Sequence, residues 1–214
     1  MEQIEEKAVS KVYSAIAGHF SSKRINQWPW ITSFIDEINI NNSRSKTLDI
    51  GCGNGRNMEI FAEHSEIFGV DNCREFVQIC HNKGHNVVYA DMTNIPYPDN
   101  YFDYLLSIAS FHHLSTRERR ITALKEFHRI SQKNCVALLS VWSLNQPKDS
   151  KQSKKITKYG DNFVSWNKNG VEYERFYYIF KRDEIEELFQ ETGWKIQEYS
   201  WNYGNEVYKL VKID

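Results

Sequence analysis

Three glycines separated by single residues, directly after a short apolar strand, constrain the fold of this chain most strongly. Residues 47–50 (Thr-Leu-Asp-Ile) predict the strand, and residues 51–55 (Gly-Cys-Gly-Asn-Gly) follow at once. Glycine adopts backbone dihedrals that other residues avoid, and its missing side chain lets a ligand approach the main chain. A glycine loop after a first strand is therefore typical of the ligand-binding edge of an open α/β sheet.

Helix and strand patterns alternate on both sides of this loop. Apolar residues at helical spacing predict one helix over residues 2–20 and a second from Ile31 to Ile38, after Pro29. Beyond the loop we predict helices over residues 58–62, 76–82, 117–130 and 182–192, and strands over residues 67–71, 86–90, 101–107, 135–142, 173–180, 194–199 and 207–213. This order predicts an α/β, Rossmann-like fold: a mostly parallel seven-stranded sheet with helices on both faces and a C-terminal antiparallel hairpin.

The 214 residues suit one domain with a sizeable core. Within it we expect an N-terminal helical cap (1–45), a cofactor-binding core (46–145), a mobile lysine-rich loop (146–172), and C-terminal strands and a helix on the substrate side (173–214). The formal net charge of -1 argues against a protein that coats nucleic acid, but it allows a local basic patch.

Acidic residues at the ends of the first three strands indicate what the glycine loop binds. The loop has G-x-G-x-G spacing rather than the dinucleotide fingerprint G-x-G-x-x-G, and Asp49 precedes it. That combination suits a ligand with an amino-acid tail, whose ammonium group Asp49 can attract directly or through water. Asp71 is placed to accept both ribose hydroxyls, although an aspartate there can also cap the next helix. Asp91 can accept from an adenine amine while Met92 packs on the ring.

Two adjacent histidines, His112 and His113, follow the fourth strand. A single histidine is more often structural than functional. A pair at this edge of the sheet predicts that at least one faces the ligand.

Together, these elements resemble the class I S-adenosylmethionine methyltransferases over residues 45–145. The resemblance implies S-adenosylmethionine as cofactor and S-adenosylhomocysteine as product, and the glycine spacing argues against a nicotinamide oxidoreductase. The residues expected to bind the cofactor are Tyr13, Arg24, Trp28, Asp49, Gly51, Cys52, Gly53, Asn54, Gly55, Asp71, Asn72, Asp91, Met92, Ser107, Ile108, Ala109 and His112.

A narrower resemblance covers nearly the whole chain. Its motifs are Val-Tyr-x-x-Ile-Ala-x-His-Phe at 12–20 with Arg24 and Trp28-Pro29, His-His-Leu-Ser-Thr-Arg-Glu-Arg-Arg at 112–120, Val-Trp-Ser-Leu-x-Gln at 141–146, Phe-Val-Ser-Trp at 163–166 and Arg-Phe-Tyr-Tyr at 175–178. These resemble the eukaryotic tRNA methyltransferases that esterify 5-carboxymethyluridine at the wobble position, including the methyltransferase domain of the AlkB-homologue fusion protein. Leu114 and Ser165 depart from the family, which often has Trp and Pro there.

The family resemblance implies 5-methoxycarbonylmethyluridine in the tRNA anticodon loop as product. It also implies a heterodimer with a small zinc-binding activator protein. The chain itself has four scattered cysteines without a Cys-x-x-Cys pair, so we expect no metal site and a reducing compartment. No signal peptide or membrane-spanning run is visible, which predicts the cytoplasm, with the nucleus as an alternative.

A carboxylate is already ionised at neutral pH, so its methylation needs no strong general base. It needs a cation or donor to orient it, and the catalytic candidates are His19, Arg24, His113 and Arg175. Both arginines could instead serve structure alone. Phosphates of the anticodon stem could contact Arg117, Arg119, Arg120 and the lysines of residues 148–158, unless the arginine run is an ordinary solvated helix face.

Two other functions share these features. A methyltransferase acting on a small carboxylic acid would use the same cofactor residues. A cofactor-binding subunit without turnover would also keep them, although intact acids at all three strand ends argue against it.

Overall fold

A computed structural model describes residues 2–38, 45–148, 150 and 155–213. Its main sheet has seven strands in the order β3-β2-β1-β4-β5-β9-β8. The five parallel strands are β1 (Lys46–Ile50), β2 (Glu66–Asp71), β3 (Asn86–Tyr89), β4 (Phe102–Ile108) and β5 (Ser131–Trp142). The antiparallel strands β8 (Trp194–Asn202) and β9 (Asn205–Lys212) complete the sheet beside β5. The predicted Rossmann-like sheet with a C-terminal hairpin is confirmed.

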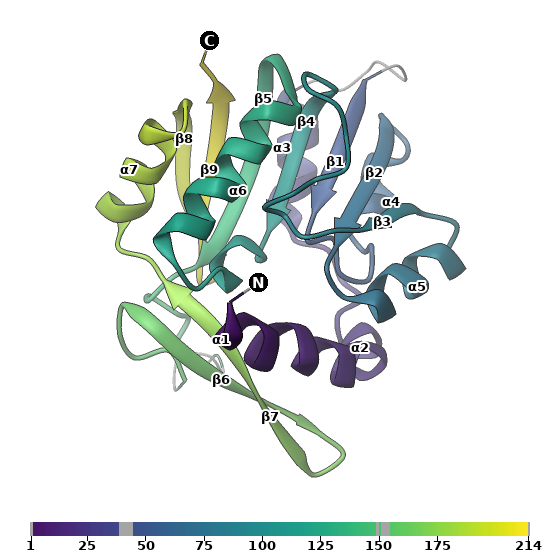
Figure 1. The fold of residues 1–214 in the computed structure, drawn as a ribbon, viewed down its shortest axis with the longest axis vertical. Coiled ribbons are helices and arrows are strands. Elements are labelled where there is room, and N and C mark those ends of the chain that lie inside the picture. Colours follow the sequence, from purple (N-terminus) through teal and green to yellow (C-terminus); the bar gives the residue numbers. More distant parts are fainter. Residues whose placement is uncertain (1, 39–44, 149, 151–154, 214) are drawn as a thin grey trace.

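Helices cover both faces of the sheet (Figure 1). In chain order they are α1 (Gln3–Glu5), the π-helical turn η1 (Glu6–Ser10), α2 (Lys11–Lys23), α3 (Pro29–Ile38), α4 (Met58–Phe61), α5 (Arg74–Asn82), the 3-10 turn η2 (Phe111–His113), α6 (Arg117–Ile130) and α7 (Arg182–Glu191). None of these described helices is long and apolar enough to cross a membrane.

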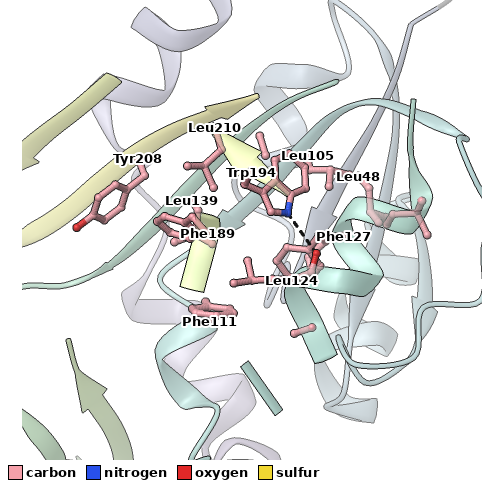
Figure 2. Packing of buried hydrophobic residues seen from close by; sticks show 14 of the residues in the cluster. Leu48, Leu105, Phe111, Leu124, Phe127, Leu139, Phe189, Trp194, Tyr208 and Leu210 are labelled. Atoms are coloured by element: carbon pink, nitrogen blue, oxygen red, sulfur yellow. Dashed lines mark hydrogen bonds between the residues drawn. The ribbon is translucent and has the colours of Figure 1, made fainter. Parts of the chain in front are cut away.

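Successive side chains of the central strands point to opposite faces of the sheet, so the hydrophobic core is divided between the two faces. Leu105, Leu139 and Leu210 pack with residues of α6 and α7, as Figure 2 shows. Their neighbours Leu106 and Leu138 pack on the opposite face against α3. Trp194 lies fully buried in the first cluster, and its indole N–H donates to the Leu124 carbonyl across 3.2 Å. Period-two burial of this kind holds the strands in register and so fixes where their ends lie.

A second, two-stranded sheet corrects one expectation. Residues 146–172 were expected to form a mobile loop, but β6 (Gly160–Lys168) pairs antiparallel with β7 (Val171–Ile179). The turn between them places Asn169 and Gly170 at φ 53° and 87°, which is the left-handed geometry that an Asn-Gly hairpin turn favours. Figure 1 shows this ribbon below the main sheet, beside the N-terminal helix. Lys151 and Lys154 lie outside the described residues.

Candidate active site

A large cavity lies at the carboxyl ends of the parallel strands, and its empty volume is about 1380 Å³ when the solvent-filled opening is included. Parallel α/β sheets bind ligands at this edge because strand ends and loops converge there. The predicted residues that line it are Tyr13, Arg24, Trp28, Gly51, Cys52, Gly53, Asn54, Asp71, Asn72, Asp91, Met92, Ile108, Ala109, His113 and Arg175. Predicted residues that do not line it are His19, Asp49, Gly55, Ser107 and His112.

The glycine loop folds tightly beneath the cavity. Gly51 has φ 72°, and a Cβ there would lie 2.5 Å from the Ser110 Cβ, so only glycine fits. Gly53 has φ 56°, and a Cβ on it would meet nothing within 4 Å. No side chain therefore covers the Gly53 backbone on this side, so a ligand can approach the main chain closely.

Asp71 both braces this loop and faces the cavity. One carboxylate oxygen accepts from the Gly53 N–H at 2.8 Å, and the other accepts from the Cys73 N–H at 2.8 Å, just before α5. Each oxygen keeps a second lone pair for a ligand hydroxyl. Burial raises the pKa of Asp71 to about 6, against the lowering effect of these two N–H groups. Asp71 thus orders the turn before α5 without capping a helix N–H, and it keeps the geometry expected for a ligand.

Asp49 lies below the loop rather than on the cavity wall. It is 1% exposed, and neither carboxylate oxygen has a hydrogen-bond partner among the described residues. Burial and then the nearby Asp71 raise the pKa of Asp49 to about 7. A buried carboxylate without a partner is costly, and an ammonium group brought to the loop would compensate it. This orphaned acid is the feature of the chain that best fits the amino-acid tail of S-adenosylmethionine.

Asp91 is held by an arginine that was expected to contact RNA. Arg119 donates to Asp91 Oδ2 at 2.7 Å and to Glu5 Oε2 at 2.8 Å, and Glu5 also accepts from Ser115. Glu5 and Asp91 both line the cavity. Arg119 therefore ties the N-terminal helix over the position predicted for adenine, and its phosphate-contacting role was wrong.

The other two arginines of the run are not a free basic face either. Arg120 is 2% exposed, donates to the carbonyls of Leu114 and Ser115, and lies over the Tyr178 ring. Arg117 is exposed but pairs with Glu191. The helix-face interpretation holds for Arg117, whereas Arg120 belongs to the core.

We predict that Arg119→Ala lowers the free energy of unfolding by about 3 kcal/mol, because it leaves Glu5 buried without its cation. Arg117→Ala is the matched control and should leave the unfolding midpoint unchanged, since exposed ion pairs contribute little. Urea unfolding measures both, and limited proteolysis should release the N-terminal helix only in Arg119→Ala. Equal midpoints for the two variants would contradict this role of Arg119.

The histidines do not supply a cation to the cavity. His113 Nδ1 lies 2.6 Å from the Phe176 carbonyl, which can only accept, so Nε2 accepts from the Tyr13 hydroxyl at 3.1 Å. Burial lowers the pKa of His113 to about 3, so its imidazole is neutral. His112 is fully buried and accepts from the Trp142 N–H. His19 accepts from the Trp166 indole N–H, away from the cavity.

Ser107 and Gly55 were also predicted to bind the ligand, but they lie outside the cavity lining and support the glycine loop. The Ser107 hydroxyl is buried and lies 3.0 Å from that of Ser110, whose own hydroxyl donates to the Ile50 carbonyl. Gly55 has φ 74°, and a Cβ there would meet the His85 ring at 2.8 Å. Both positions therefore shape the glycine loop without reaching its ligand side.

Arg175, on β7, lines the cavity without a counter-charge among the described residues, as do Arg24 and Arg56, and Arg175 is buried among aromatic rings. It is 3% exposed and lies among the rings of Trp166, Tyr177 and Tyr13, at 5.0, 5.3 and 5.9 Å. Its closest polar contact is the Tyr13 hydroxyl at 3.5 Å, and its Nε has no partner. No carboxylate of the described residues lies within ion-pair distance of it. A buried guanidinium in this state is a ready binding site for an anion.

Arg24 also lines the cavity and has no described ion pair. It follows α2, where its carbonyl accepts from Asn54 Nδ2 at 3.0 Å, and its guanidinium lies 6.0 Å from the Phe20 ring. The Arg24 backbone is therefore held at the glycine loop, whereas its guanidinium lies 5.9 Å from the Trp166 ring, which Arg175 also approaches, at 5.0 Å. Either guanidinium can bind an anion in this part of the cavity.

The cavity has two chemically distinct halves. Asp71 and Asp91 line the half over β1, β2 and β3, where Arg119 joins Glu5 to Asp91, and Arg24 and Arg56 line this half as well. The other half is lined by Arg175, Trp142, Gln146 and Tyr177, which stand in the motifs quoted above, and by three residues that the sequence did not single out, Tyr203, Gly204 and Asn205. A cationic cofactor suits the first half, and an anionic substrate suits the second.

Comparison with known proteins identifies methyltransferases as relatives of this chain. A family described as "Methyltransferase domain" matches residues 48–139. A tRNA (carboxymethyluridine(34)-5-O)-methyltransferase from Schizosaccharomyces pombe is 31% identical and covers 95% of both chains. An Arabidopsis thaliana protein of the same name is 39% identical over 71% of this chain, which spans only 37% of that longer relative.

Solved structures show the same fold at low sequence identity. An S-adenosylmethionine-dependent methyltransferase from Clostridium acetobutylicum superposes with a TM-score of 0.73 at 15% identity, covering 94% of this chain and 98% of that one. The methyltransferase in a complex with the Haloferax volcanii Trm112 activator superposes with a TM-score of 0.66 at 14% identity, covering 97% and 98%.

Proposed function

The chain belongs to the tRNA (carboxymethyluridine(34)-5-O)-methyltransferase family and is an S-adenosylmethionine-dependent enzyme. We propose that it esterifies the carboxylate of 5-carboxymethyluridine at the wobble position of tRNA. Support comes from the fission yeast relative, which matches over nearly its whole length. The product is 5-methoxycarbonylmethyluridine.

One observation carries the choice of a carboxylate as methyl acceptor. Arg175 is buried in the substrate half of the cavity with no acid beside it. A carboxylate can accept two hydrogen bonds from a guanidinium and neutralise its charge. A nucleophile that must first lose a proton would need a base, and the neutral His113 already has both ring nitrogens engaged.

The chain's residues then act by position and electrostatics. S-adenosylmethionine supplies a methyl group activated by a sulfonium. Asp49 and Asp71 attract and orient the amino-acid tail and ribose, while the bare Gly53 backbone allows close approach. Arg175 orients the substrate carboxylate and excludes water from it. Because an anion and a cation neutralise each other in this transfer, a dry cavity favours it.

We further propose that the chain works in complex with a small zinc-binding activator protein. The family resemblance implies such a partner, and a structural neighbour is a methyltransferase bound to the Trm112 activator. The tRNA phosphates are then expected to meet basic residues other than Arg119 and Arg120, whose side chains are engaged inside the protein.

The test is methyl transfer by the co-expressed chain and activator to tRNA that carries 5-carboxymethyluridine. Nucleoside analysis should show a methyl ester that mild alkali hydrolyses back to the acid. A small carboxylic acid offered alone should not be methylated. Methylation of the small acid and not of the tRNA would establish the small-molecule alternative, and an alkali-stable methyl group would exclude a carboxylate acceptor.

A further inference from the structure

An exposed aromatic ring stands at the substrate half of the cavity. Tyr203 lines the cavity and is 72% exposed. It lies in the two-residue turn between β8 and β9, with φ 46° followed by Gly204 at 82°. A bulky side chain in the left-handed region is unusual and strained. The chain's other hairpin has Asn169 and Gly170 in the equivalent turn positions, so tyrosine is not what this geometry favours.

The turn is clamped against the end of β5. The Gly204 carbonyl accepts from the Ser143 N–H at 2.8 Å and from Gln146 Nε2 at 2.7 Å. Gly204 has φ 82°, and a Cβ on it would lie 2.4 Å from Gln146 Oε1, so a larger residue would displace the amide that clamps the turn. Asn205 Nδ2 donates to the Asn202 carbonyl at 3.1 Å. The backbone of the strained tyrosine is thus held in one place at the cavity, while its side chain is largely exposed.

Gln146 also lines this part of the cavity, and its amide has an unused acceptor beside Gly204 but no unused donor. Its amide nitrogen donates both hydrogens, to the carbonyls of Ser143 at 2.8 Å and Gly204 at 2.7 Å. This fixes the amide orientation and leaves Oε1 without a donor among the described residues. Asn205, also in the lining and 1% exposed, likewise has an Oδ1 with no partner.

We propose that this corner is a subsite for the substrate base, in which Tyr203 stacks on the pyrimidine ring and Gln146 Oε1 accepts the N3–H of uracil. The proposal rests on the function proposed above and names how the same site selects its nucleotide. Bases of single-stranded RNA loops are commonly held by aromatic stacking and read at their Watson–Crick edge. Uracil has a hydrogen on N3, whereas the N3 of cytosine is itself an acceptor. A fixed amide oxygen therefore admits uracil and repels cytosine.

Tyr203→Asn tests the stacking contact without breaking the turn, because asparagine tolerates left-handed dihedrals. With the activator complex and an anticodon stem-loop carrying 5-carboxymethyluridine, KM should rise about tenfold or more, because stacking on one aromatic ring contributes that much per base. Tyr203→Phe should keep the wild-type KM, and so should Tyr159→Asn, which removes an exposed tyrosine outside this cavity. Tyr203→Asn should not lower the melting temperature, and its affinity for S-adenosylhomocysteine should equal that of wild type.

The role of Gln146 is tested by comparing two RNAs that differ only in 5-carboxymethyluridine or 5-carboxymethylcytidine. Wild type should prefer the uridine by at least about tenfold in kcat/KM, as expected when a donor meets an acceptor rather than another acceptor. Gln146→Leu should shrink this ratio; a purely structural role would lower both rates and leave the ratio unchanged.

The outcomes separate the subsite from the function. The subsite alone would be overturned if wild type methylates the uridine RNA and Tyr203→Asn leaves KM unchanged. The same holds if Gln146→Leu leaves the base preference unchanged. Absence of wild-type activity on the uridine RNA, with methylation of another acceptor, would overturn the proposed function and the subsite together.

Discussion

Replacing Arg175 by glutamine should lower kcat for the tRNA substrate about 10²-fold, as expected when the group that positions the reacting carboxylate is lost. The affinity for S-adenosylhomocysteine should stay within about twofold of wild type, because Arg175 belongs to the substrate half of the cavity. Steady-state kinetics at saturating S-adenosylmethionine, with calorimetry of the product complex, measures both quantities.

The same substitution should not destabilise the protein. Burial without an acid costs folding free energy, but the surrounding rings attract the guanidinium, so Arg175→Gln should leave the melting temperature nearly unchanged. Arg120→Gln is the matched control: Arg120 is equally buried but donates to two carbonyls, and its loss should lower the melting temperature. A fall in cofactor affinity as large as the fall in kcat would instead assign Arg175 to the cofactor's own carboxylate.

Asp49→Asn should weaken S-adenosylhomocysteine binding by roughly thirtyfold or more, because it removes the buried negative charge proposed to meet the ligand's ammonium group. In wild type the affinity should fall as the pH drops below about 7, where the Asp49 carboxylate takes up a proton. Calorimetry at pH 5.5 and pH 8 measures this dependence. The variant should lose most of it and keep only a smaller fall near pH 6, where Asp71 takes up a proton. A variant that binds as tightly as wild type at pH 8 would remove Asp49 from the cofactor site.

Asp49 should also make the cofactor-free protein less stable as the pH rises. Its folded-state pKa of about 7 lies above the ordinary value of 3.8, so between these values the folded state binds more protons than the unfolded state. The free energy of unfolding therefore falls from pH 4 to pH 7, by on the order of 3 kcal/mol from this group. Asp49→Asn should flatten that slope in urea unfolding, whereas Asp161→Asn, at an exposed position, should not.

The strand ends were predictable because their signals are local. Buried parallel strands read as short apolar runs, and Asp71, Asp91 and the glycines follow those runs directly. The strand predicted over residues 173–180 is confirmed as β7, but its partner β6 was missed. Asn169-Gly170 is a strong turn signal, yet the polar and lysine-rich residues before it resemble a loop.

Partners that come from distant segments could not be predicted. Arg119 and Arg120 are adjacent in sequence, but helical geometry turns one towards Glu5 and Asp91 and the other towards Tyr178. Charge patterning shows that arginines are present and does not show what they meet. The absence of an acid beside Arg175 and the place of Tyr203 in the cavity lining likewise depend on which strands pack together. No local sequence pattern carries that information.

The central claim is that the acidic half of the cavity holds the cofactor while Arg175 holds the substrate carboxylate. The most direct test is a crystal structure of the chain with S-adenosylhomocysteine and 5-carboxymethyluridine. We predict the adenosyl amino acid over Gly53 and Asp71, and the nucleoside carboxylate paired with Arg175 and turned towards the cofactor sulfur. A carboxylate bound elsewhere, or Arg175 paired with the cofactor's own tail, would contradict the account.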